Sequence, residues 1–260
     1  MSLQNSSKIN QIMQKWPAGT IALSQWFNDN GISSQLLSKY KKSGWIEPIG
    51  SGAFKKANDS VDYTGAVYAM QNQLGLSIHP GGKTALSLQG KAHYLELKTK
   101  YAYLYRKKDE KIPVWFKNYK WDVSIENFSS SFLPAELGLI DLKVNNYDIK
   151  ISSPARAILE CLLHASTDED MLMCYQLLEG LNNLNPGKVQ NLLENCSSVK
   201  VKRLFLFMAD DIGHAWFKYI KMNNIDTGKG KRSFCKNGIY VDKYKITVPK
   251  QLKANNGPEI

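Results

Sequence analysis

Three short triplets place an acidic residue two positions before a lysine, in segments with strand-like patterning. They are Glu96-Leu97-Lys98, Asp141-Leu142-Lys143 and Asp148-Ile149-Lys150. Residues i and i+2 of a strand lie on the same face, so each carboxylate has its ammonium group as a neighbour. An acid that binds a divalent metal, next to a lysine that helps to activate water, is typical of a metal-dependent nuclease. Alternating acids and lysines are also common on a solvent face, and no Pro-Asp pair precedes the triplets. Nuclease chemistry is therefore the alternative interpretation.

Cysteine and histidine form no metal-binding pattern. Zinc sites usually draw their ligands from closely spaced pairs. The cysteines are far apart and form no CxxC pair, and the histidines form no HxxxH pair. These residues are Cys161, Cys174, Cys196, Cys235, His79, His93, His164 and His214. We therefore expect no metal. The sequence also lacks a GxxxxGK[ST] phosphate loop and the GxSxG motif of acyl enzymes, so we expect no other cofactor, no catalytic residue and no enzymatic activity.

The charge of the chain indicates an anionic partner. The 260 residues include 34 Lys and Arg and 23 Asp and Glu, which gives a net charge of +11. Only Arg106, Arg156, Arg203 and Arg232 are arginines. Lysine is a hydrated point charge that suits phosphates better than bidentate contacts with bases. Nucleic acid is one such partner, and lysine-rich compositions also occur in proteins that do not bind nucleic acid.

Nothing in the composition indicates a membrane protein. Hydrophobic residues make up 43% of the chain, which is enough for a core. No apolar run approaches the roughly 20 residues of a membrane span. The first 16 residues lack the apolar core of a signal peptide. We expect a cytoplasmic protein that does not contact a membrane.

The N-terminal segment has the element order of a winged helix-turn-helix. Apolar residues recur at helical spacing over residues 5–16, 20–29 and 33–42, and Gly44 follows the third helix. The runs "WIEPI" and "AFKKA" then flank "GSG", as two strands joined by a glycine turn do. In such a motif the third helix enters the DNA major groove and the hairpin lies along the phosphates.

The outward residues of this third helix and of the hairpin are the candidate DNA contacts. Ser33 is also the predicted N-cap, and the short polar side chains suit base edges while the lysines suit phosphates. The candidates are Ser33, Ser34, Gln35, Ser38, Lys39, Lys41 and Lys42 of the helix, and Ser51, Lys55 and Lys56 of the hairpin. We expect the last two lysines to contact phosphates whatever the sequence.

The remainder of the chain predicts an α+β protein. Residues 61–92 are expected to form a helical connection between a DNA-binding domain of residues 1–60 and a C-terminal domain of residues 93–260. That domain begins with strand-like segments over 93–152 and continues as helices to residue 220, as a C-terminal bundle. The last forty residues turn irregular and basic, and residues 222–253 hold eight Lys and Arg against two Asp, a net +6.

Three stretches carry a resemblance to a known family. They are "TIALSQWFNDNGISSQLLSKYKKSGWIEPIGSGAFKK", "YAMQNQLGLSIHPGGKTALSLQGKAHYL" and the helix that begins "SSPARAILECLL". In this order they resemble the AbiEi-type antitoxins of abortive-infection, type IV toxin–antitoxin systems. The resemblance covers most of residues 1–165 and, more loosely, the helices that follow.

The resemblance implies a transcriptional autorepressor that binds inverted repeats in its own promoter. It places the recognition helix at residues 33–42 and the wing at 46–56. It also implies a C-terminal domain that counters a co-encoded nucleotidyltransferase-like toxin without a stable complex. Since the chain has one DNA-binding module and no long heptad run, we expect a free monomer and two copies per inverted repeat.

Overall fold

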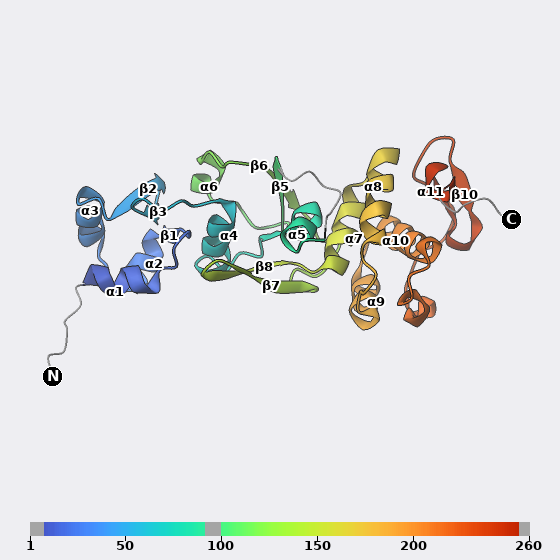
Figure 1. The fold of residues 1–260 in the computed structure, drawn as a ribbon, viewed down its shortest axis with the longest axis horizontal. Helices are drawn as coiled ribbons and strands as arrows, with labels where there is room; N and C mark the ends of the chain where they lie inside the picture. The colour runs from blue at the N-terminus through green and yellow to red at the C-terminus, as the bar shows by residue number, and fades with distance from the viewer. Residues whose placement is uncertain (1–7, 92–99, 255–260) are drawn as a thin grey trace. The chain divides into compact units, whose positions relative to one another are not determined.

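The chain begins with three short helices and a small antiparallel sheet, in the predicted order (Figure 1). The computed structural model describes residues 8–91 and 100–254. The three strands lie in the order β1-β3-β2, with an irregularity in the register between Pro48 and Gly50. The predicted winged helix is confirmed as the N-terminal part of an α+β fold. Its elements are α1 (Lys8–Lys15), β1 (Ala22–Leu23), α2 (Ser24–Asp29), α3 (Ser34–Lys42), β2 (Ile46–Gly50) and β3 (Ala53–Lys56).

The second helix is shorter than predicted, because residues 20–23 are not helical. Ile21, Ala22 and Leu23 are all buried. Consecutive buried side chains cannot share one face of a helix, but a strand within the protein buries both of its faces. Ala22 and Leu23 pair with β3. On the side of β1 that does not face β3, the side-chain amide of Gln73 bonds to the backbone. It accepts from Leu23 N at 2.9 Å and donates to Ile21 O at 2.8 Å.

The winged helix has a hydrophobic core of its own. Trp16 and Phe27 meet edge to face with ring centroids 5.4 Å apart, and the Trp16 indole donates to Thr20 O at 3.2 Å. The buried members of this core are Ile12, Trp16, Ala22, Phe27, Ile32, Leu37, Ile46 and Phe54. These side chains come from every helix and strand of the motif, so the core fixes α3 against the sheet.

The whole chain forms two compact units that interleave along the sequence. The first unit holds the described residues up to His79 together with 105–129 and 141–150, and the second holds the rest. The domain boundaries predicted at residues 60 and 92 separate segments by their expected functions, whereas these units are defined by compactness. The predicted boundaries therefore stay predictions.

Beyond the wing, the chain adds a helix, a short helix and several strands. Residues 112–128 were expected to be strand-like, but residues 114–118 form the helix α6 after Pro113. Proline fixes φ in the helical range and is favoured at the start of a helix, which explains the difference. The elements are α4 (Tyr63–Asn72), α6 (Val114–Asn118), the sheet of β4 (His79–Pro80), β5 (Tyr101–Arg106) and β6 (Ser124–Ser129), and the hairpin of β7 (Leu139–Val144) and β8 (Tyr147–Ser152).

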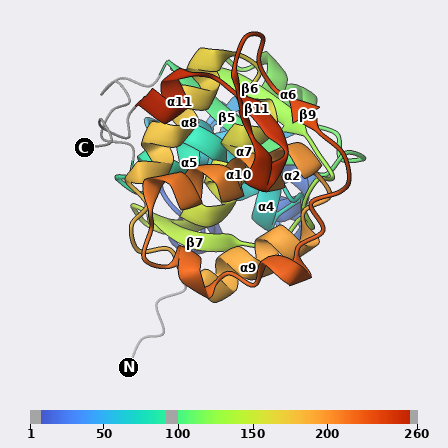
Figure 2. The same cartoon turned by 90° about the vertical axis from the view of Figure 1, so that its right-hand side faces the viewer.

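The second unit is built around the predicted C-terminal helices, and α11 packs beside α8 (Figure 2). Ser153 caps α7 with Pro154 in its first turn, and Thr167 and Asp170 form a capping box at α8. The predicted helix through residue 220 ends early, because Gly213 adopts a left-handed φ of 75°. The helices are α5 (Gly82–Leu88), α7 (Pro154–His164), α8 (Asp168–Glu179), α9 (Pro186–Asn195), α10 (Val199–Ile212) and α11 (Gln251–Ala254).

The basic C-terminal segment is more regular than expected. Two 3-10 turns and a sheet in the order β10-β11-β9 replace the predicted irregular chain, and a third 3-10 turn lies just before it. The buried guanidinium of Arg203 holds this segment, since it donates to four backbone carbonyls at 2.7–3.1 Å, those of Thr227, Gly228, Gly230 and Lys245. The elements are η1 (Phe217–Tyr219), η2 (Met222–Asn224), β9 (Arg232–Ser233), β10 (Ile239–Val241), η3 (Asp242–Tyr244) and β11 (Ile246–Val248).

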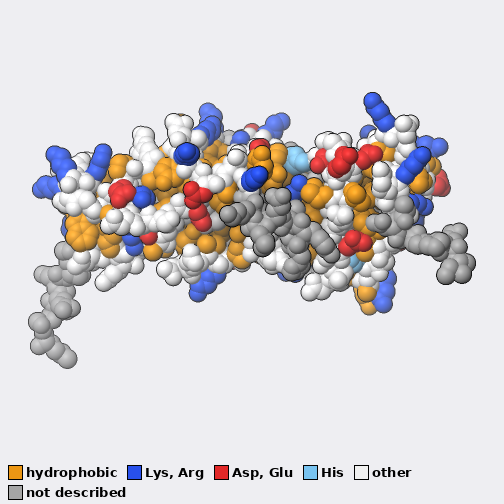
Figure 3. Space-filling model, turned by 45° about the horizontal axis from the view of Figure 1, so that its top comes forward, with side chains coloured by type: hydrophobic (Ala, Val, Ile, Leu, Met, Phe, Trp, Pro, Cys, Tyr) orange, Lys and Arg blue, Asp and Glu red, His pale blue; other side chains and the backbone are white. Residues whose placement is uncertain are grey.

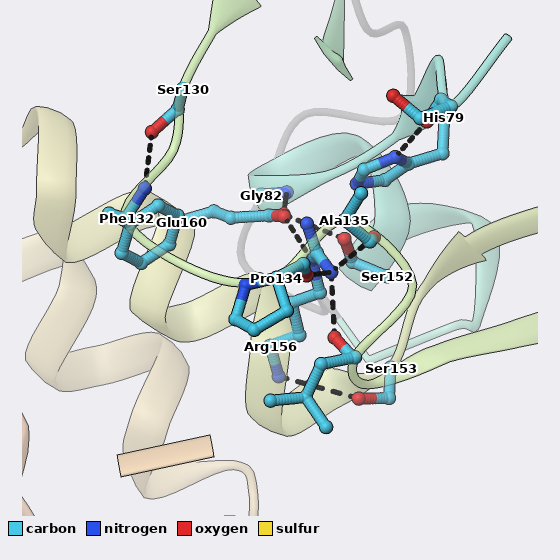
Figure 4. Close-up of polar contacts among 12 residues, drawn as sticks. His79, Gly82, Ser130, Phe132, Pro134, Ala135, Ser152, Ser153, Arg156 and Glu160 are labelled. Atoms are coloured by element: carbon cyan, nitrogen blue, oxygen red, sulfur yellow. Dashed lines mark hydrogen bonds and ion pairs between the residues drawn. The ribbon is translucent and has the colours of Figure 1, made fainter. Parts of the chain in front are cut away.

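A buried ion pair lies within helix α7, and its arginine also bonds to the loop before β7 (Figure 4). Arg156 Nε lies 2.8 Å from Glu160 Oε1, one helical turn away, and both side chains are at most 5% exposed. The remaining hydrogen-bonding capacity is used by the surrounding backbone and one hydroxyl. Arg156 donates to the carbonyls of Pro134, Ala135 and Leu137, and Glu160 accepts from Gly82 N and Ser152 Oγ.

Candidate nucleic-acid interface

Both ends of helix α3 are fixed by local hydrogen bonds. Ser33 is the N-cap, and its Oγ accepts from Leu36 N at 3.3 Å, as predicted. At the other end Gly44 has a φ of 69° and donates to Lys41 O, while Trp45 N donates to Tyr40 O at 3.0 Å. This pair of bonds is a Schellman motif. The helix therefore has a defined start and stop, and its outer face has a fixed length.

The outer face of α3 carries the seven helix residues predicted to contact DNA, and all seven are exposed. Leu37 lies on the opposite side, buried in the core. Figure 3 shows Lys and Arg side chains gathered at the end of the first unit that α3 occupies. The exposed residues are Ser33, Ser34, Gln35, Ser38, Lys39, Lys41 and Lys42.

This face combines two kinds of donor at different positions along the helix. Ser34, Gln35 and Ser38 lie in its first half, where short hydroxyls and an amide can bond to base edges. The three lysines lie in the last turn, where cations also interact favourably with the helix dipole. The arrangement suits polar contacts in the groove near the start of the helix and phosphate contacts near its end.

The wing presents fewer free groups than expected. Ser51 is exposed at the turn, next to Gly52 with a φ of 71°. The Lys55 ammonium instead lies 3.0 Å from Glu47 Oε2 and donates to Asp59 O. Lys56 donates to Met13 O at 3.0 Å, and burial lowers the pKa of its ammonium. The phosphate contacts of these two lysines stay a prediction, and an ammonium group has three N–H donors, so each would make them beside its partners within the protein.

The ion pair across the wing gives a prediction about acidity. The hydrogen bond from Lys55 is the main reason why the pKa of Glu47 lies below its ordinary value of 4.5, and the Asn58 N–H adds to it. Because the pKa is lower in the folded state, the ionised Glu47 stabilises the fold above pH 4.5. This stabilisation is lost as the pH falls through the lowered pKa. We expect Lys55→Ala to raise the pKa of Glu47, as followed by NMR titration of the side-chain carboxyl. An unchanged pKa would show that the pair does not persist in solution.

Helix α6 holds the wing in place through a close contact. A Cβ built on Gly50 would lie 2.6 Å from Trp115 Cβ and 3.0 Å from its Cα. Real Cβ atoms do not approach this closely, so a glycine is needed for α6 to lie against the wing turn. Trp115 is itself buried. The wing position therefore depends on a residue 65 positions later in the chain.

Gly50→Ala should displace the wing from α6. We expect the free energy of unfolding to fall by about 1–3 kcal/mol, the usual cost of overpacking. Chemical denaturation measures this loss. Gly180→Ala is the matched control, because Gly180 has a φ of −69° and its nearest contact would be at 3.5 Å. Equal effects of the two substitutions would argue against the tight contact.

The nuclease triplets are not arranged as a cleft in the described part of the chain. Asp141, Lys143, Asp148 and Lys150 are exposed on β7 and β8, and Lys150 pairs with Asp141 across the hairpin at 3.9 Å. The third triplet, with Glu96 and Lys98, lies outside the described residues. Among residues 8–91 and 100–254, no three His, Cys, Asp or Glu side chains come together as a metal site requires. The pattern on this hairpin is that of a solvent face.

Sequence reasoning did not identify two aromatic residues beside the candidate interface. Trp45 is 48% exposed directly after α3. The step "SGW" was visible in the sequence, but nothing in it showed on which side the indole would lie. Trp115 could not have been connected with the wing, because its contact with Gly50 is made only in the folded chain.

Comparison with known proteins places the whole chain in one group. Residues 5–97 match the family described as transcriptional regulator, AbiEi antitoxin N-terminal domain. Residues 99–249 match that of transcriptional regulator, AbiEi antitoxin, type IV TA system. The chain belongs to the AbiEi antitoxin family. The family resemblance inferred from the three sequence stretches is thereby confirmed, and this AbiEi protein is an antitoxin-type transcriptional regulator.

A solved structure supports the fold of this AbiEi protein. The crystal structure of the RV2827C protein from Mycobacterium tuberculosis superposes with a TM-score of 0.58. The match covers 92% of this chain and 89% of that one at 10% sequence identity, so it concerns the fold alone. A search of curated protein sequences gave no significant match. In the part of the chain that is described, no helix is long and apolar enough to cross a membrane.

Proposed function

We propose that this AbiEi protein binds double-stranded DNA in its own promoter and represses its own operon. The observation that carries the proposal is the outer face of α3, with seven exposed polar or basic side chains on a helix capped at both ends. In winged helix-turn-helix proteins the helix at this place enters the major groove. Ser34, Gln35 and Ser38 then contact base edges, and the lysines of α3 bind phosphates. Ser33, at the start of the helix, and Ser51, at the wing turn, also contact the DNA.

The wing lysines also have a part in this proposal. Lys55 and Lys56 contact phosphates with the ammonium N–H donors that their bonds within the protein leave unused. The exposed Ser51 at the turn can approach a phosphate as well.

Two copies are proposed to occupy one inverted repeat. One winged helix reads a half-site, and operators usually supply two half-sites one or more helical turns apart. We expect a monomer in free solution. Sedimentation without DNA and titration of the repeat test this, with a monomer and two proteins per repeat as the expected results. A stable dimer at micromolar concentration without DNA would contradict it.

The C-terminal helices are proposed to carry the antitoxin role, which needs no catalysis by this chain. They counter a co-encoded nucleotidyltransferase-like toxin without a stable complex, as the family resemblance implies. Co-expression with the neighbouring gene tests the division of labour. The full chain should rescue growth, and residues 1–90 alone should not. Rescue by residues 1–90 would place the antitoxin role in the N-terminal part.

The DNA-binding proposal is tested on the DNA upstream of the gene. A mobility-shift titration should show a complex with this DNA at concentrations where unrelated DNA of equal length is free. A transcriptional reporter fused to the same DNA should be repressed by the protein. Equal affinity for both DNA fragments, with no repression, would refute the proposal.

A further inference from the structure

Helix α6 borders a groove that the DNA-binding proposal does not use. The groove has a volume of about 370 Å³ and runs between α6, the loop that follows it, and strand β6. Ligand sites for small molecules are concave, mostly apolar, and fall in the range of roughly 300–1,000 Å³. Its main lining residues are Ile112, Phe116, Lys117, Tyr119, Trp121 and Ile125.

The aromatic wall of this groove is preformed. Trp121 lies 5.1 Å from Phe116 and 4.6 Å from Tyr119, measured between ring centroids. The Trp121 indole N–H donates to Phe116 O at 2.9 Å, which fixes the orientation of the ring. A planar ring could enter without breaking this bond, since the bond lies within the wall. Aromatic pairs of this kind favour stacked or edge-on contacts with another ring.

The positive charge at the groove favours a ligand with a negative charge. Lys117 is the one charged side chain of the lining, and it is exposed on α6. A carboxylate or sulfonate on the ligand would pair with this ammonium, while the ring fills the apolar part. We propose that the groove between α6 and β6 binds a small aromatic anion.

The groove is joined to the wing through adjacent residues of α6. Phe116 lines the groove, while Trp115 packs on Gly50 of the wing, and the two rings meet edge-on with centroids 5.9 Å apart. A ligand that fits the groove as it stands stabilises α6 in this position and therefore the wing as well. Because a ligand favours the conformation it binds best, it should strengthen DNA binding. This step rests on the proposed DNA-binding function.

Binding is tested first on the full chain without DNA. Naphthalene-1-acetate is the probe and its uncharged amide is the comparison, both titrated by isothermal calorimetry. The acid should bind to one site, and Lys117→Ala should weaken it by about fivefold, the upper range for an exposed ion pair. Lys218→Ala is the control, because Lys218 is likewise an exposed lysine next to an aromatic side chain, that of Tyr219 at 5.1 Å, but it lies in the second unit. This control should leave the affinity unchanged.

The effect on the wing is measured by DNA binding in the presence of saturating probe. The affinity for the upstream DNA should rise by about fivefold, the lower end of typical coupling between two sites. Lys117→Ala should need proportionately more probe for the same effect. No heat of binding, or binding that is equal for acid and amide, would overturn the site. Bound probe with unchanged or weaker DNA affinity would overturn its link to the wing. Failure of the free protein to bind DNA would refute the proposed function, and the calorimetry would still decide the groove.

Discussion

Replacing Arg156 with methionine should lower the free energy of unfolding by about 3–5 kcal/mol, the usual cost of removing one partner of a buried ion pair. Glu160 is fully buried, and its charge would lose the guanidinium 2.8 Å away. Three carbonyls of the loop before β7 would also lose their donor. Buried polar groups without partners are costly. The unpaired charge of Glu160 and the three carbonyls without a donor should therefore both lower the stability of the variant. Chemical denaturation followed by circular dichroism measures the change.

Two further variants separate the buried charge from simple loss of contacts. Arg156→Met combined with Glu160→Leu removes both charges, so it should be less destabilised than Arg156→Met alone. Lys150→Ala removes an exposed pair with Asp141, and it should cost less than about 1 kcal/mol. The account of the network is wrong if Arg156→Met costs no more than Lys150→Ala.

Removing the three lysines of α3 should change how DNA binding responds to salt. Each phosphate contact contributes about 0.9 to the slope of log affinity against log salt. Alanine at Lys39, Lys41 and Lys42 together should therefore make the slope about 2.7 units less steep. Over a fourfold change in salt, this is a difference of roughly 40-fold in affinity. Fluorescence anisotropy at several salt concentrations measures the slope.

The triple variant should lose affinity equally for all DNA sequences, because phosphates carry no sequence information. Lys188→Ala is the control, since Lys188 is exposed on α9 in the second unit. Its slope should match that of the unmodified protein. An unchanged slope in the triple variant would mean that these lysines do not lie at phosphates.

The parts of the interface that sequence could predict are those fixed by local chemistry. Ser33 as N-cap and Gly44 as the stop of α3 depend on bonds within a few residues, so their residue types are informative. Local chemistry also fixes the cap at Ser153 and the hairpin turn at Asn145, which has a φ of 51°. Solvent exposure on one face of α3 follows from helical periodicity alone.

Contacts across the chain explain what sequence could not show. The Lys56 ammonium bonds to Met13 O, 43 positions earlier, and no local pattern distinguishes it from a free lysine. The sequence predicts helix where β1 lies, because the strand's partner is about 30 residues later in β3. Likewise, the spacing of Arg156 and Glu160 shows that they can pair, but not that loop carbonyls complete their bonds.

The most direct test of the central claim compares Gln35→Ala with the unmodified protein on two DNA fragments. One fragment is the inverted repeat upstream of the gene, and the other has the same composition in scrambled order. If α3 reads bases, Gln35→Ala should reduce the preference for the repeat by about 1–3 kcal/mol, with unchanged affinity for scrambled DNA. A preference that stays the same in Gln35→Ala, and also in Ser34→Ala, would contradict the assignment of α3 as the helix that reads the operator.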